Sequence, residues 1–179
     1  SPAGMARCKP LSAVERLATK CAVRADERLL ARIVECLEED SVPEVRAAAA
    51  QALGTVTAGG EQSVLNALAQ CLKEDEAPGA KRAALGAFWK LSKKDDSCAV
   101  DIVGARLEDK DRGVRQAAVE ALEGLAGRGL RAPAVAIASA RLKHRSTTVR
   151  RTAVEAVTRL AEKGDELIIA TLGECLADQ

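Results

Sequence analysis

The stretch SVPEVRAAAAQAL, residues 41–53, carries a proline, then Val-Arg, then a run of alanines. Related stretches follow at a constant distance: AKRAALGAF begins at Ala80, VRQAAVEAL at Val114 and VRRTAVEAV at Val149. Counted from Val45, the copies are spaced by 35, 34 and 35 residues. A repeat of this length is typical of a stacked array of helical units, in which each unit packs on its neighbours.

A second segment recurs with the same period, so the repeat is longer than the alanine-rich stretch. It reads ECLEED, QCLKED, ARLEDK, ARLKHR and ECLADQ, and its leucines are Leu37, Leu72, Leu107, Leu142 and Leu176. These leucines are spaced by 35, 35, 35 and 34 residues. Two segments that keep one period over four or five copies predict a repeat array along nearly the whole chain.

Each unit holds two helical patterns. In the first, apolar residues fall at i, i+3, i+4 and i+7, as in Leu30, Ile33, Val34 and Leu37. In the second, we expect one apolar face, formed in the first unit by Val45, Ala48, Ala49, Ala52, Leu53 and Val56. Alanine is the strongest helix former, and its small side chain lets neighbouring helices approach closely. The alanine-rich face is therefore interpreted as a packing surface.

Local signals place the helix ends. Pro43 suits a first helical turn, and Asp26, Asp96 and Asp165 precede first helices as N-caps, with Glu61 at the same position of its unit. Glycines fall in the turns between units, at Gly59, Gly60, Gly127, Gly129 and Gly164. Ten helices are predicted, over 11–24, 27–38, 43–57, 62–73, 79–92, 97–108, 112–126, 132–143, 147–162 and 166–177.

The expected architecture is an all-α superhelix, a right-handed α-solenoid of helix pairs without a β-sheet. It forms a single array over 11–179, with full repeats at 26–60, 61–95, 96–130 and 131–164 and half repeats at 11–25 and 165–179. Residues 1–10 are expected to be a tail, in which Met5 could be a native start behind a short cloning scar.

The last predicted helix, 166–177, is left unpaired on its outer side, because only ADQ follows Leu176. It carries more apolar residues than one contact face needs, namely Leu167, Ile168, Ile169 and Leu172. Exposed stacking surface at the end of a repeat array promotes aggregation. We therefore expect further repeats or a partner to cover this end, or the chain to self-associate end to end through 166–177 or to fray there.

The composition limits the classes of partner. The 27 basic and 26 acidic residues give a net charge of +1, so bulk attraction to nucleic acid or to an anionic membrane is not expected. The sequence contains neither an apolar run long enough for a membrane span nor an apolar signal-peptide region. The six cysteines form no CxxC motif, which favours reduced thiols and an intracellular, cytoplasmic location.

The unit DERLLARIVECLEED…PEVRAAAAQALG, residues 26–54, resembles the HEAT repeat, specifically the short HEAT-like type also found in phycobilisome lyases. The resemblance covers about residues 11–179. It implies an Asp in the turn within each unit and an Arg six residues later, which together form a hydrogen-bonded ladder between units. The corresponding pairs are Asp40 with Arg46, Asp75 with Lys81 and Asp109 with Arg115. In the fourth unit His144 replaces the Asp ahead of Arg150, so the ladder should break there.

The sequence offers little for catalysis. His144 is the one histidine, so neither a multi-histidine metal site nor the His-Glu pairs of the HEAT-like iron hydroxylase can form. The HEAT-like DNA glycosylases stack DNA on aromatic side chains, and Phe88 and Trp89 are a thin supply. A widely shared fold does not transfer an activity. We therefore expect no enzymatic activity, no cofactor and no metal, and a lyase-type subunit is a distant alternative.

Binding in such arrays is expected on the second helices, which usually line the concave side. The stripe opposite the predicted core offers six candidate partner-binding residues: Arg82, Trp89, Gln116, Glu120, Arg151 and Glu155. A tryptophan on a polar face is a typical binding anchor. The alternative is that Trp89 folds over Phe88 or Lys90 and covers a thin part of the core.

A second candidate surface is the basic turn RLKHRSTTVRR, residues 141–151. Its cations surround Ser146 and the start of the following helix, where free N–H groups can also bind an anion. The candidate anion-binding residues are Lys143, His144, Arg145, Arg150 and Arg151, together with Arg141. The alternative is a solvated basic turn.

Two function hypotheses follow. The leading one is a protein-binding scaffold, or a segment of a larger HEAT-repeat scaffold, that holds a partner protein or peptide on the concave face. The alternative is contact with an anion or a nucleic acid through 141–151, although nucleic acid is disfavoured by the balanced charge. Binding driven by phosphate contacts weakens steeply as salt rises, whereas a contact anchored by Trp89 does not.

Overall fold

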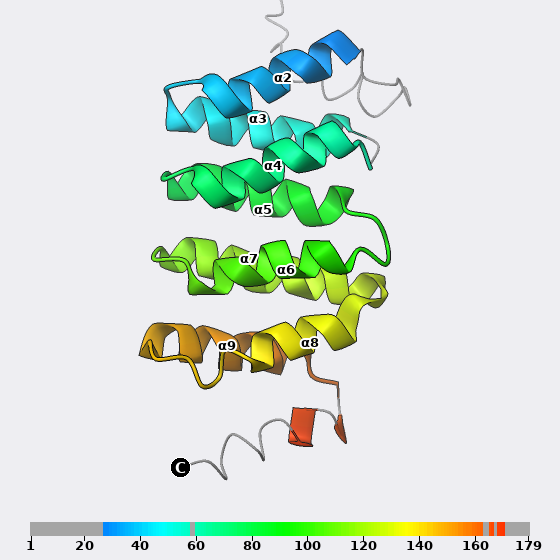
Figure 1. Cartoon of the computed structure of the whole chain (residues 1–179), viewed down its shortest axis with the longest axis vertical. Coiled ribbons are helices and arrows are strands. Elements are labelled where there is room, and N and C mark those ends of the chain that lie inside the picture. The colour runs from blue at the N-terminus through cyan, green and yellow to red at the C-terminus, as the bar shows by residue number, and fades with distance from the viewer. Residues whose placement is uncertain (1–26, 58–59, 163–164, 167, 171–179) are drawn as a thin grey trace, which may run out of the picture.

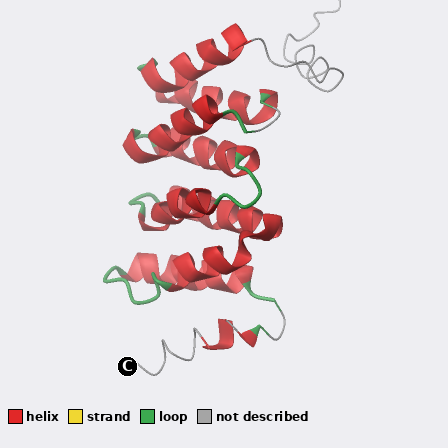
Figure 2. Cartoon of the chain, turned by 45° about the vertical axis from the view of Figure 1, so that its right-hand side comes forward, coloured by secondary structure: helices red, strands yellow, loops and turns green. Residues whose placement is uncertain are grey.

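A computed structural model describes residues 27–57, 60–162, 165–166 and 168–170. All regular structure in these residues is helical, and they contain no strand (Figure 2). The α-helices are α2 (Glu27–Glu39), α3 (Pro43–Val56), α4 (Gln62–Glu74), α5 (Pro78–Leu91), α6 (Ser97–Ala105), α7 (Arg112–Leu125), α8 (Arg131–Ser139) and α9 (Thr147–Leu160). A 3₁₀ turn, η1 (Arg106–Glu108), extends α6, and a π-type segment, η2 (Ala126–Leu130), joins α7 to α8.

The helices form pairs that are stacked along the long axis of the molecule (Figure 1). The pairs are α2 with α3, α4 with α5, α6 with α7, and α8 with α9. The second helices α3, α5, α7 and α9 pack on one another in order, and they form one layer of the array. The first helices form the other layer. The fold is an all-α solenoid, which confirms the predicted fold class.

The second helices are buried on two sides, whereas the periodicity predicted one apolar face for each of them. Ala50, Leu85 and Val119 occupy one repeat position and are almost fully buried, because the following unit covers them. The equivalent Val154 in the last described second helix is 49% exposed. The single predicted face was therefore too narrow, and it was partly wrong in α3, where Val45 and Ala48 are exposed.

Val45 is more exposed than the residues at the same repeat position because of its place in the array. Ala80 and Val114, which occupy the same position in the next two units, are fully buried. Both lie in units that follow another described unit, whereas no described unit precedes the unit of Val45. The two packing sides explain the alanine content, since a helix held between two neighbours needs small side chains on both of these sides.

Two predicted helix boundaries in the second half of the array were inaccurate. α8 ends at Ser139 instead of residue 143, and the chain continues in turns in which Arg141 and Leu142 N–H groups donate to Ala138 and Ser139 carbonyls. The predicted open turn near 127–131 is instead η2, a helical connection. Gly129 reverses the chain there with a φ of +99°, a conformation that glycine adopts without strain.

The predicted helix caps are partly present. The Asp96 carboxylate accepts a hydrogen bond from the Ala99 N–H at 3.3 Å, and Pro43 lies in the first turn of α3. Glu61 makes no side-chain cap, and the Asp165 carboxylate contacts Arg131. Asp111, which was not predicted as a cap, accepts from the Val114 N–H at 2.9 Å.

The predicted half repeats fall largely outside the described residues. This applies to Asp26, to the helix 11–24 and to most of 166–177, so self-association through that end stays a prediction. Residues 168–170 are helical, with Ile168 buried and Ile169 exposed. Within the described ranges, no helix is both long and apolar enough to cross a membrane.

Candidate functional site

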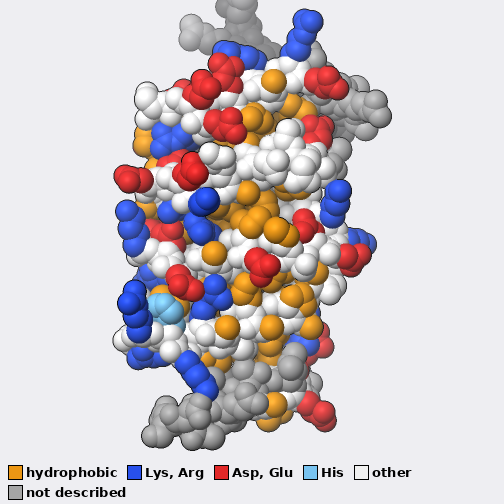
Figure 3. All heavy atoms as spheres, viewed as in Figure 1, with side chains coloured by type: hydrophobic (Ala, Val, Ile, Leu, Met, Phe, Trp, Pro, Cys, Tyr) orange, Lys and Arg blue, Asp and Glu red, His pale blue; other side chains and the backbone are white. Residues whose placement is uncertain are grey.

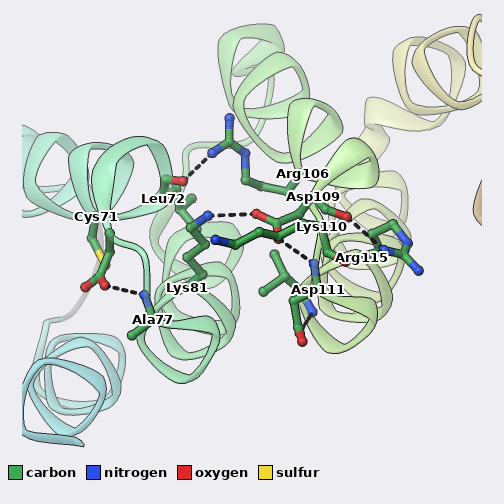
Figure 4. A network of polar contacts seen from close by, with 11 residues as sticks. Cys71, Leu72, Ala77, Lys81, Arg106, Asp109, Lys110, Asp111 and Arg115 are labelled. Atoms are coloured by element: carbon green, nitrogen blue, oxygen red, sulfur yellow. Dashed lines mark hydrogen bonds and ion pairs between the residues drawn. The ribbon is translucent and has the colours of Figure 1, made fainter. Parts of the chain in front are cut away.

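A ladder of charged groups joins successive units at the edge of the array where each first helix turns into the second (Figure 4). Arg46 forms a bidentate pair with Asp75, with Nε to Oδ2 at 2.7 Å and Nη2 to Oδ1 at 2.9 Å. Lys81 Nζ lies 2.8 Å from Asp109 Oδ2. Each cation comes from the start of one second helix and each carboxylate from the turn of the next unit, so the pairs tie neighbouring units together.

The ladder cations also bind the turn of their own unit. Arg46 Nη1 donates to the Asp40 carbonyl and Arg115 Nη1 to the Asp109 carbonyl, both at 2.8 Å. Residues six apart in the sequence thus meet through the backbone, while the ion pairs connect different units. A guanidinium has enough donors to serve both partners at once.

The carboxylates are positioned by the turns that carry them. Asp40, Asp75 and Asp109 each accept a hydrogen bond from the N–H two residues later, at 2.8, 2.8 and 2.9 Å. This local bond fixes one carboxylate oxygen. In Asp75 and Asp109 the carboxylate also faces the cation of the preceding unit.

The fourth unit keeps the turn and loses the ion pair. His144 Nδ1 accepts from the Ser146 N–H at 3.0 Å, so the imidazole replaces the carboxylate as the acceptor within the turn. Arg115 has no carboxylate to bind and donates instead to Thr152 Oγ1 at 3.3 Å. Because the Thr152 hydroxyl is neutral, this hydrogen bond is a weaker link between the third and fourth units than an ion pair would be.

The ladder changes the ionisation of its members. The hydrogen bond from Arg46 holds the pKa of Asp75 below its ordinary value, although burial of the carboxyl opposes this. Burial also works against ionisation of Asp109, yet the Lys81 hydrogen bond, the Asp111 N–H and the nearby cations keep its pKa low. Burial, reinforced by the Asp75 charge, raises the pKa of Cys71 to about 12, so this thiol stays protonated at neutral pH.

These lowered pKa values predict how stability depends on pH. The pKa values of Asp75 and Asp109 are lower in the folded chain than the ordinary value near 3.9 that holds in the unfolded chain. Their ionised carboxylates therefore stabilise the fold fully above that value. This stabilisation is lost as the pH falls through their folded pKa values. Urea unfolding followed by circular dichroism should therefore show falling stability below about pH 4. The variant with Asp75→Asn and Asp109→Asn should show a shallower fall, and an equally steep fall in this variant would contradict the assignment.

Trp89 is packed within the array. Its half-buried ring lies directly over Gly124 of α7, where a Cβ atom would come within 2.5 Å of the ring. Arg128 also contacts the ring, with its guanidinium carbon 5.4 Å from the ring centroid and its nitrogens donating to the Ser92 and Lys90 carbonyls. This geometry favours a covering role for Trp89 over that of an open binding anchor.

Two of the four predicted partner-binding residues in units three and four, Gln116 and Glu155, bind each other. Gln116 donates to Glu155 at 2.9 Å, and Arg159 lies 3.5 Å from Glu123 and 3.6 Å from Glu155. Glu120 and Arg151 are exposed. The polar network therefore links α7 to α9.

Units one and two present a different surface between α3 and α5. A depression of 510 Å³ lies there, lined by Gln51, Gly54, Thr55, Gly79, Arg82, Ala83, Gly86, Ala87 and Lys90. Gly79 and Gly86 face open space. Gly54 has another role, because a Cβ atom there would come within 2.9 Å of the Ala87 Cβ, so this glycine allows α3 and α5 to approach closely.

The charge of this depression is uniformly positive. Arg82 and Lys90 line it, and neither forms an ion pair with any residue in the described ranges. None of the carboxylates that the structure describes contributes to the lining. Of the six candidate partner-binding residues, only Arg82 lies here. Lys90 was missed, although its position in the unit was available from the repeat.

The basic turn at 141–151 is partly neutralised. Arg141 Nε lies 3.0 Å from Glu108, and His144 Nε2 lies 3.5 Å from the same carboxylate. Arg150 donates to the His144 and Arg145 carbonyls of its own turn. Lys143, Arg145 and Arg151 are exposed.

Comparison with known proteins gives a family match for part of the chain. Residues 10–89 match the family model for HEAT repeats. This part of the chain is therefore similar to HEAT repeats. HEAT repeats typically serve as protein-interaction scaffolds and are generally non-enzymatic. No curated protein matches the chain. Among solved structures, the crystal structure of an engineered protein is similar over 82% of this chain and 67% of its own, with 16% identity and a TM-score of 0.47.

The helical array shows no metal-binding arrangement in the part of the chain that the structure describes, where no group of three or more His, Cys, Asp or Glu side chains is placed to hold an ion. Cys36, Cys71 and Cys98 are free thiols. Asp75 and Asp109, which carry the lowered pKa values, are occupied by ion pairs and turn hydrogen bonds.

Proposed function

We propose that this chain is a non-enzymatic interaction scaffold that binds an acidic segment of a partner protein in the depression between α3 and α5. The observation that carries the proposal is the pair of unpaired cations in this depression. Arg82 and Lys90 lie eight residues apart on α5, about 12 Å along the helix axis. Two carboxylates of one bound segment can therefore reach both cations.

The glycines of the depression support the same proposal. Gly79 and Gly86 have open space where other residues would place a Cβ atom. A bound chain can therefore approach the α5 backbone closely between the two cations. The partner gains contact area there without displacing a side chain of the scaffold.

The basic turn at 141–151 is the second candidate surface and the weaker one. Three of its basic residues, Arg141, His144 and Arg150, are already engaged by Glu108 or by turn carbonyls. An anion bound there would compete with these contacts. In the α3–α5 depression neither Arg82 nor Lys90 forms an ion pair with a residue that the structure describes, although Lys90 Nζ lies 6.0 Å from the Trp89 ring centroid.

A peptide display library selected on the purified chain tests the proposal. We expect acidic peptides to be enriched on the wild-type chain and lost on the variant with Arg82→Glu and Lys90→Glu, because the reversed charges repel carboxylates. A variant with Arg145→Glu and Arg151→Glu carries the same change in net charge and should keep the enrichment. Equal enrichment on all three chains would contradict the proposed site.

A further inference from the structure

The first helices do not all pack on one another. α2 packs against α4, and α6 packs against α8, but α4 and α6 make no comparable contact. A groove of 740 Å³ lies between them, on the face opposite the second helices. In the space-filling view, apolar side chains gather near the middle of this face (Figure 3).

The groove has an apolar floor and charged ends. Ala69 and Leu72 of α4 face Ile102 and Ala105 of α6, and all of them except the buried Leu72 are partly exposed. Further lining comes from Asn66, Gln70, Lys73, Glu74, Asp101 and Arg106. The small side chains Ala69 and Ala105 let a further element come close to both walls.

We propose that an amphipathic helix of a partner protein binds in this groove between α4 and α6. The walls are helices whose backbone groups are bonded internally along most of their length, so they offer no row of free N–H and C=O groups to an extended peptide. A helix satisfies its own backbone and can lay an apolar stripe along the floor. This surface is separate from the α3–α5 depression, so the inference does not depend on the function proposed above.

The charges of the groove define the partner further. Lys73 and Asp101 are exposed, and neither forms an ion pair with a described residue. Asp101 is equivalent to Asn66 in the repeat, so it lies about 10 Å from Lys73 along the groove. A complementary helix carries a carboxylate near Lys73 and a cation about seven residues away, near Asp101.

The dipoles of the helices set the direction in which the partner helix binds. α4 and α6 run in parallel, and both end near Lys73 and Arg106. A partner helix that runs antiparallel to them places its N-terminus at this end, where an acidic first turn is favourable for its own dipole and complementary to Lys73. The inferred partner is therefore an amphipathic helix with an acidic first turn, a basic residue about seven positions later and an apolar stripe between them.

Two designed amphipathic helices of identical composition test the inference by fluorescence anisotropy. One carries Glu in the first turn and Lys seven residues later, and the other has these two residues exchanged. The wild-type chain should bind the first helix at least about tenfold more tightly. The variant with Lys73→Glu and Asp101→Lys keeps the net charge and should reverse this preference.

A second pair of variants tests the apolar floor. Ala69→Phe fills the groove and should weaken binding of the preferred helix at least about tenfold, whereas Ala136→Phe, on the exposed surface of α8, should leave it unchanged. Circular dichroism confirms that both variants are folded. The inference is overturned if neither helix binds, if the exchanged charges do not reverse the preference, or if Ala136→Phe weakens binding as much as Ala69→Phe. Loss of a chain dimer in Ala69→Phe would likewise overturn it, since a second copy would then be the occupant.

Discussion

Replacing Asp75 by alanine is expected to lower the free energy of unfolding by about 3 kcal/mol, the order of loss when one partner of a buried ion pair is removed. Asp75 is almost fully buried, and its carboxylate accepts both the bidentate pair from Arg46 and the Ala77 N–H. Without it, the Arg46 guanidinium is left without a counter-charge between units one and two. The turn ahead of α5 loses its local hydrogen bond as well.

Urea unfolding of the variant at pH 7 measures this loss. Asp75→Asn should cost less than Asp75→Ala, because the amide oxygen can still accept the hydrogen bond from Ala77. Glu120→Ala is the matched control, since Glu120 is an exposed carboxylate without an ion pair to the rest of the described array, and it should change stability by less than about 0.5 kcal/mol. Similar small effects of Asp75→Ala and Glu120→Ala would show that the ladder does not hold the units together.

Replacing Gly124 by valine is expected to cost about 3 kcal/mol, as in other cases where a packed interior is overfilled. The new Cβ would come within 2.5 Å of Trp89 Cε3 and within 2.7 Å of Cζ3. The ring has to leave its place beside Gly124 and Arg128. Because this is the one tryptophan of the chain, its fluorescence emission should shift to longer wavelength as the ring becomes hydrated.

Two further variants separate the clash from other effects of the valine. Gly127→Val introduces the same side chain at a glycine with open space around it, so its cost should stay below that of Gly124→Val. In a Trp89→Leu background, Gly124→Val should cost less than in the wild-type chain, because the smaller side chain relieves the contact. An undiminished cost in that background would mean that Trp89 does not pack on Gly124.

The repeat and the helix pairs could be predicted because they depend on features spaced along the sequence. The leucines and the alanine-rich stretches recur in phase, and this phase alone defines units of two helices. Helix ends were less predictable where side chains and glycine override periodicity. Arg141 lies beyond the end of α8, and its side chain donates to the Ile137 carbonyl within that helix. Gly129 turns the chain within a helical connection.

The packing between units was less accessible to sequence reasoning. A single apolar stripe describes how a helix meets one neighbour, whereas Leu85 and Val119 are buried by a second neighbour on another side. Trp89 looked exposed because its own helix face is polar, and the glycine that receives its ring lies 35 residues later, in another unit. The position of His144 did reveal where the ladder loses a carboxylate, because the ladder residues keep a constant place in the repeat.

The binding surfaces depend on gaps that no sequence pattern encodes. The groove between α4 and α6 exists because these helices fail to pack as the other first helices do. The depression between α3 and α5 depends on glycines whose open surroundings emerge only when the helices are placed side by side. Single residues such as Arg82 could be selected from the sequence. That Arg82 and Lys90 line the same open depression could not be predicted.

The most direct test of the proposed scaffold function is the dissociation constant of one selected acidic peptide, measured by fluorescence anisotropy for two variants beside the wild-type chain. Gly86→Phe fills the α3–α5 depression without altering charge, and it should weaken binding at least about tenfold. The variant with Arg145→Glu and Arg151→Glu should bind within about twofold of the wild type. Unchanged binding by Gly86→Phe, with binding lost in the Arg145 and Arg151 variant, would place the site at the basic turn and contradict the proposed function.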